Sequence, residues 1–234
     1  MPPIPLILWD IDHTLLVTHG VGGRCFADAY TRVVGEPMRE QAVPDGRTEP
    51  VIFRETAVLH GHPPDAYRFE EFAEALAAAY LHRLPELREH GHALPGAHAA
   101  IDALHRAGAV QTVVTGNIRA VADIKLAAFG LDRHLDPDLG AYADDHTDRP
   151  ELVRLALHRA SAKHSPWISA AHTIVIGDTP KDVAAAIGAG TRILGVASGN
   201  HTIQVLKAAG ATACVNDLRN TVNVVALTLT AAQA

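Results

Sequence analysis

Short runs of mostly apolar residues recur along the chain, and three of them lead into polar clusters. Runs of this length are too short for helices and are typical of strands that are buried on both faces. We therefore expect five strands, at residues 4–8, 110–114, 173–176, 192–196 and 214–215.

Other stretches place apolar residues at three- and four-residue spacing, which predicts amphipathic helices. The expected helices cover residues 24–34, 50–59, 69–84, 97–107, 118–129, 180–188, 202–209 and 222–229, and a further helix begins at Pro150. Gly35 and Gly130 stand where they would end two of these helices, and Asn117 stands where it would cap the start of one. Residues 18–92 contain no convincing strand, and residues 135–143 are expected to form a loop with a weak strand.

The order of these elements predicts the fold class. From residue 94 onward strands and helices alternate, which is typical of an α/β protein with a parallel sheet. The helical block separates the first strand from the others. We expect a Rossmann-like, doubly wound parallel sheet built from residues 1–17 and 93–234, with an all-helical domain of residues 18–92 inserted into it.

Composition narrows the functional classes. The 234 residues carry a formal net charge of −6 and are 48% hydrophobic, with mean hydropathy of +0.07 and a pI near 6.2. An acidic chain lacks the basic footprint expected of a nucleic-acid binder, and no apolar stretch approaches a membrane span. The start lacks the basic region of a signal peptide, so we expect a cytoplasmic protein. Cys25 and Cys214 are expected to be reduced, buried thiols.

Candidate chemistry lies at the ends of three expected strands. The polar residues that follow them are Asp10 and Asp12, Thr115 and Asn117, and Asp178 and Asp182. In a parallel sheet the carboxyl ends of the strands share one edge, where ligands bind. We therefore expect the three clusters to meet at one site.

Two carboxylates one residue apart repel each other, and a divalent cation relieves that repulsion. Oxygen ligands suit Mg²⁺, and the expected donors are Asp10, Asp12, Asp178 and Asp182. A strand end followed by a polar turn would also explain Asp10 and Asp12. Asp182 fits a helix start equally well, with Thr179 as its cap.

The same residues fit phosphoryl transfer. Asp10 could act as the nucleophile and Asp12 as the general acid and base. The Thr115 hydroxyl and the amides around Gly116 and Asn117 could hold phosphoryl oxygens at a helix start, where the dipole favours an anion.

A transferring phosphoryl group also needs a cation. Arg149 precedes Pro150 at a helix start, and Lys125 interrupts the apolar face of helix 118–129. We favour Arg149 and keep Lys125 as the alternative, although each is compatible with a simple surface charge.

These motifs resemble the haloacid dehalogenase superfamily, specifically its phosphoglycolate-phosphatase-like branch, in which a helical cap is inserted after the first motif. Residues 10–14 (DIDHT) resemble its first motif, residues 113–117 (VVTGN) its second and residues 177–182 (GDTPKD) its fourth. Arg149 stands where the third motif normally has lysine. His13 replaces the usual glycine, which places a ring beside the site.

The resemblance implies a Mg²⁺-dependent phosphatase that hydrolyses phosphomonoesters of small metabolites through an aspartyl-phosphate on Asp10. Asp12 favours phosphate-ester chemistry, because dehalogenases of the family lack an acid there. Cap residues then select the substrate, with Arg24 and the stretch 47–49 (RTE) as candidates. A phosphosugar mutase and a catalytically idle binding protein are the alternatives. We expect a monomer or small homo-oligomer that binds neither nucleic acid nor membranes.

Overall fold

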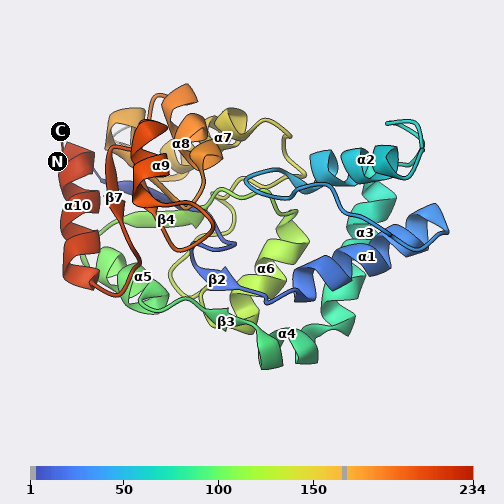
Figure 1. Cartoon of the computed structure of the whole chain (residues 1–234). Helices are drawn as coiled ribbons and strands as arrows, with labels where there is room; N and C mark the ends of the chain where they lie inside the picture. Colours follow the sequence, from blue (N-terminus) through green and yellow to red (C-terminus); the bar gives the residue numbers. More distant parts are fainter. Residues whose placement is uncertain (1–3, 165–167, 234) are drawn as a thin grey trace.

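A parallel sheet of five strands forms the centre of the protein (Figure 1). The computed structural model describes residues 4–164 and 168–233. The strand order is β4-β1-β5-β6-β7. Their bounds are β1 Leu6–Trp9, β4 Val110–Val113, β5 Thr173–Gly177, β6 Arg192–Val196 and β7 Ala213–Val215. The predicted α/β fold with a parallel sheet is confirmed.

The first strand shows why the apolar runs fold this way. All four side chains of β1 are fully buried, and successive side chains of a strand point to opposite faces. Ile7 and Trp9 enter one hydrophobic core, whereas Leu6 and Leu8 enter another. The strand is hydrogen-bonded to β4 on one side and β5 on the other. It can therefore be apolar at every position.

Helices cover both faces, as a doubly wound sheet requires. One core contains side chains from α5 (Ala97–Arg106), α6 (Arg119–Ala128) and α10 (Thr221–Gln233). The other contains side chains from α7 (Arg149–His164), α8 (Pro180–Gly188) and α9 (Ile203–Ala208). The short 3₁₀ helix η1 (Ala170–His172) leads into β5.

Four helices lie together to one side of the sheet (Figure 1). They are α1 (Val21–Val34), α2 (Glu49–Leu59), α3 (Phe69–His82) and α4 (Leu84–His90). Aromatic side chains of α1, α2 and α3, including Phe26, Phe53 and Phe72, form a third core. An antiparallel pair, β2 (Leu16–Val17) with β3 (His92–Ala93), joins the two ends of this segment.

Three local predictions are wrong. The expected helix 69–84 ends at His82, and a separate helix that was not predicted, α4, begins at Leu84; Pro85 in its first turn cannot continue the hydrogen bonding of α3. Asn117 does not cap α6: the capping residue is Ile118, and the Asn117 amide is used elsewhere. Cys214 is only half-buried.

Two helix ends are confirmed. Gly35 and Gly130 follow α1 and α6 with positive φ angles of 85° and 66°, which L side chains disfavour. Among the described residues, the helices are too short or too polar to cross a bilayer.

Candidate active site

Three adjacent strands bring the predicted clusters together. Asp10 directly follows β1, Thr115 follows β4 and Asp178 follows β5, and β1 lies between the other two. The Asp10 amide donates to the Ile176 carbonyl across 2.8 Å, which holds Asp10 at the edge of β5. The sheet register therefore fixes the neighbours of Asp10.

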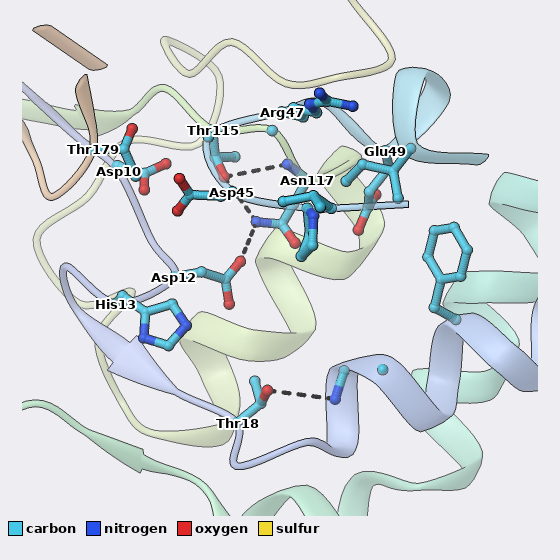
Figure 2. A pocket seen from close by; sticks show the side chains of 18 of the residues that line it. Asp10, Asp12, His13, Thr18, Asp45, Arg47, Glu49, Thr115, Asn117 and Thr179 are labelled. Carbon is cyan, nitrogen blue, oxygen red and sulfur yellow. Dashed lines mark hydrogen bonds between the residues drawn. The ribbon is translucent and has the colours of Figure 1, made fainter. Parts of the chain in front are cut away.

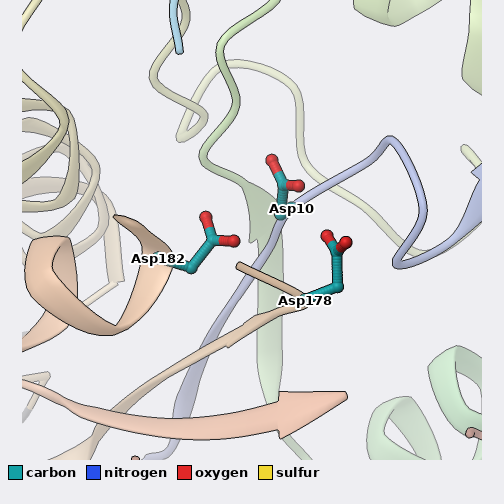
Figure 3. A group of neighbouring side chains, drawn as sticks. All are labelled: Asp10, Asp178 and Asp182. Atoms are coloured by element: carbon teal, nitrogen blue, oxygen red, sulfur yellow. The ribbon is translucent and has the colours of Figure 1, made fainter. Parts of the chain in front are cut away.

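A buried acidic group lies at this edge (Figure 3). It comprises Asp10, Asp178 and Asp182, whose nearest carboxylate oxygens lie within 4.8 Å of one another. They are 7%, 2% and 0% exposed. Burial, followed by the charge of Asp182, raises the pKa of Asp10 to about 8. Burial and the charge of Asp10 raise the pKa of Asp178 to about 9.

The donor set fits Mg²⁺. Closely spaced buried carboxylates are stabilised when a divalent cation offsets their mutual repulsion, and oxygen ligands are those that Mg²⁺ prefers. Asp10 and Asp178 are the better placed of the three to hold it. Asp182 already accepts from the amide and hydroxyl of Thr179 at 3.0 and 2.7 Å, within a capping box at the start of α8. Its second oxygen accepts from Arg149.

Arg149 is the cation next to Asp10. It begins α7 and is almost completely buried. Its Nη2 donates to Asp182 and, across 3.4 Å, to Asp10 Oδ1. Its Nε is buried without a hydrogen-bond partner in the part of the chain that the structure describes. The structure thus places Arg149 at Asp10, as the third-motif prediction requires.

Asp12 is not part of the acidic group, and Figure 2 shows its side chain directed at Asn117. Its carboxylate accepts from Lys125 Nζ at 2.8 and 2.7 Å and from Asn117 Nδ2 at 2.8 Å. Burial opposes ionisation of Asp12, but the charge and hydrogen bonds of Lys125 outweigh it and lower the pKa of Asp12. The structure therefore brings Asp12 to Lys125 and does not bring its side chain to the three expected metal ligands.

The loop of residues 115–117 is held closely against the start of α2. Thr115 Oγ1 accepts from Asn117 Nδ2 at 2.8 Å. The Gly116 carbonyl accepts from the Glu49 amide at 2.8 Å, and a Cβ on Gly116 would lie 2.1 Å from the Arg47 carbonyl oxygen. Only glycine permits this approach.

Glu49, a predicted substrate contact, is a buried partner of this loop and also lines the neighbouring cavity, as Arg47 does. Its Oε2 accepts from the Ile118 amide at 2.7 Å. Burial raises its pKa to about 8. Arg47 forms an ion pair with Glu55. Arg24 forms an ion pair with Glu86 at 2.7 Å and does not line the cavity.

A cavity of about 430 Å³ lies between the sheet edge and the helical segment. The clusters at the sheet edge open into it, and the opposite wall comes from α1–α3 and their loops. That wall includes Phe26, Gln41, Asp45 and Tyr80. The sequence offered no sign of these four, because residues on an apolar helix face or in a loop carry no motif. His13 also lines the cavity and has a positive φ of 61°.

The arrangement can act on an anionic group. A carboxylate oxygen of Asp10 faces a buried cation and an acidic group suited to Mg²⁺, and a second carboxylate is held nearby. A nucleophile, an electrostatic clamp and a separate acid or base are the parts that phosphoryl transfer requires.

Comparison with known proteins agrees with this geometry. The chain is 28% identical over 207 residues to "Probable phosphatase IndB" of Dickeya dadantii (strain 3937), covering 88% of this chain and 86% of that protein. The solved structure of "HAD hydrolase, family IA, variant 3" from Entamoeba histolytica superposes with a TM-score of 0.69 at 19% identity, covering 96% and 99% of the two chains. "Putative beta-phosphoglucomutase from Bacteroides vulgatus" superposes with a TM-score of 0.68 at 19% identity, covering 99% and 91%. Residues 7–186 match the model of the haloacid dehalogenase-like hydrolases, and the chain belongs to that family.

Proposed function

We propose that this hydrolase is a Mg²⁺-dependent phosphatase that acts on phosphomonoesters of small metabolites through an aspartyl-phosphate on Asp10. The observation that carries the proposal is the meeting of Asp10 with Arg149, Asp178 and Asp182 at one end of the sheet. The similarity to a probable phosphatase supports it.

In the first step a carboxylate oxygen of Asp10 attacks phosphorus, and the bond from phosphorus to the leaving oxygen breaks. Arg149 and the Thr115 hydroxyl hold the phosphoryl oxygens. Lys125 favours the ionised form of Asp12, so Asp12 first takes up a proton from solvent and then gives it to the departing alkoxide. When bound by Asp10 and Asp178, Mg²⁺ supplies charge that offsets the negative charge of the phosphoryl group.

In the second step Asp12 takes a proton from water, whose oxygen attacks the same phosphorus. The bond between phosphorus and Asp10 breaks, which regenerates the carboxylate and releases inorganic phosphate. Asp12 is thereby returned to the protonated form that the first step needs, so no further reactant is required.

The proposal is tested by phosphate release from p-nitrophenyl phosphate, with Mg²⁺ and with excess chelator, by the wild type, Asp10→Asn and Asp178→Asn. Release that needs Mg²⁺ and is lost in Asp10→Asn is the expected result. Full activity in Asp10→Asn would exclude Asp10 as the nucleophile. Formation of a beryllofluoride adduct on Asp10 separates a selective enzyme from an idle binding protein. A phosphosugar mutase would return the group to a sugar phosphate and release little phosphate.

A further inference from the structure

Lys125 is a buried cation whose hydrogen bonds are all directed at Asp12 and Asn117. It lies on α6 and is 4% exposed. An ammonium group has three N–H donors. Lys125 Nζ lies 2.8 and 2.7 Å from the two Asp12 oxygens and 2.7 Å from Asn117 Oδ1. No donor is left for a phosphoryl oxygen, so this arrangement gives Lys125 a task other than binding phosphate.

Asn117 closes the network. Its Oδ1 accepts from Lys125, and its Nδ2 donates to both Asp12 Oδ2 and Thr115 Oγ1 at 2.8 Å. The three bonds fix the orientation of the amide. Each Asp12 oxygen thereby accepts a hydrogen bond from an identified donor. Asn117 also links the Asp12 carboxylate to the loop that carries Thr115 (Figure 2).

The environment makes Lys125 the main constraint on Asp12. Both side chains line the cavity, but the Asp12 side chain is 37% exposed and that of Lys125 only 5%. The Tyr80 ring of α3 lies 5.4 Å from Nζ, within the range of a cation–π interaction. A buried charged donor thus holds a carboxylate whose exposed part can still meet substrate.

We propose that Lys125 is a positioning residue that holds Asp12 where the leaving-group oxygen departs. The proposal rests on the proposed phosphatase function. It predicts that removal of Lys125 lowers kcat/KM most for the esters whose leaving group needs a proton from Asp12. Esters of poorly leaving alcohols depend on this transfer, whereas p-nitrophenolate leaves without it.

The test compares kcat/KM for glycerol phosphate and p-nitrophenyl phosphate in the wild type and Lys125→Met. This parameter covers steps up to transfer to Asp10 and excludes the attack of water. We expect a loss of about 100-fold for glycerol phosphate and of less than about tenfold for p-nitrophenyl phosphate. Equal losses on both esters would overturn the proposal, because a general structural defect does not distinguish leaving groups.

Two variants give the controls. Lys163→Met removes a half-exposed lysine that is ion-paired with Asp136 at 2.7 Å, and both kcat/KM values are expected to match those of the wild type. In an Asp12→Asn background, Lys125→Met should cause no further change in the ratio of the two values, since Lys125 acts through Asp12. A further selective loss would assign Lys125 a role independent of Asp12 and contradict the proposal.

Crystal structures of the wild type and Lys125→Met give a readout that does not need turnover. We expect the Asp12 carboxylate to turn away from Asn117 in the variant, and an unmoved carboxylate would overturn the proposal. This structural comparison tests the positioning role even if the wild type hydrolyses neither ester. Failure to hydrolyse either ester would refute the phosphatase function and leave the positioning role to be decided by the structures. If Lys125→Met does not unfold cooperatively, Lys125→Gln, which keeps a neutral donor, takes its place in both experiments.

Discussion

Replacing Gly116 with alanine tests the close contact between the 115–117 loop and the start of α2. The new Cβ would lie 2.1 Å from the Arg47 carbonyl oxygen and 3.3 Å from Thr48 Cα. Gly116 lies outside the left-handed region of φ, so alanine is compatible with its backbone. The perturbation is therefore a single steric contact with main-chain atoms, which cannot rotate away as a flexible side chain can.

The size of the effect follows from that contact. A Cβ and a carbonyl oxygen need a separation of roughly 3 Å, so one of the two segments must move by about 1 Å. This shift breaks the bond from the Glu49 amide to the Gly116 carbonyl, which is 2.8 Å long. Crowding of this kind costs about 1–3 kcal/mol of stability. Displacement of the neighbouring Thr115 by about 1 Å lowers kcat/KM by up to about 100-fold.

The assay pairs kcat/KM for p-nitrophenyl phosphate with the midpoint of urea unfolding. Gly23→Ala is the control for the unfolding measurement alone, because its Cβ would meet only the Gln41 side chain at an ordinary distance of 3.8 Å, although both residues line the cavity. Alanine also has a higher helix propensity than glycine, and Gly23 lies in the first turn of α1, so this variant should be at least as stable as the wild type. Wild-type activity and stability in Gly116→Ala would refute the reasoning, since the two segments would then not be in contact in solution.

Two further predictions concern Arg149 and Glu49. Arg149→Ala should weaken inhibition by inorganic phosphate more than Lys125→Ala does, because Arg149 faces Asp10 whereas the donors of Lys125 are used by Asp12 and Asn117; the opposite ranking would make Lys125 the phosphate-binding cation. For Glu49, burial raises the pKa from 4.5 to about 8, so the folded protein keeps a proton that the unfolded chain releases. The stabilisation that burial of protonated Glu49 gives to the folded state is therefore fully present below pH 4.5 and is lost as the pH rises to 8. Glu49→Gln should reduce the loss of stability between pH 5 and 8 by on the order of 2 kcal/mol, measured by urea unfolding at both pH values; identical pH dependence in variant and wild type would contradict the assignment.

Much of the sheet was predictable because buried strands and their polar ends leave a local pattern. The four longer strands lie within two residues of their expected bounds, and Asp10, Thr115 and Asp178 follow three of them. Once those strands are parallel neighbours, the meeting of these residues follows from topology. The division into the two expected domains remains a prediction.

The remaining features depend on contacts that no local pattern records. α4 and the β2–β3 pair are short, and their stability comes from packing between distant segments. From its position in the sequence, Lys125 was a candidate for the cation that binds phosphate. Only the fold shows that it forms an ion pair with Asp12. Sequence spacing also could not decide between the helix-capping and metal-binding roles of Asp182, whose oxygens bond Thr179 and Arg149.

The interior position of β1, with β4 on one side and β5 on the other, has a consequence for the order in which the protein can mature. The first strand to be synthesised needs partners on both sides, and the later of these partners to be made is β5, where Leu6 pairs with Thr173. At about 5–20 residues per second, a ribosome makes that partner roughly 8–30 s after β1. Over that interval Asp10 exists without Asp178 beside it. The nascent chain thus carries Asp10, its proposed nucleophile, from the beginning, yet it acquires the complete acidic group only near the end of synthesis. On that proposal, catalytic competence coincides with nearly complete folding.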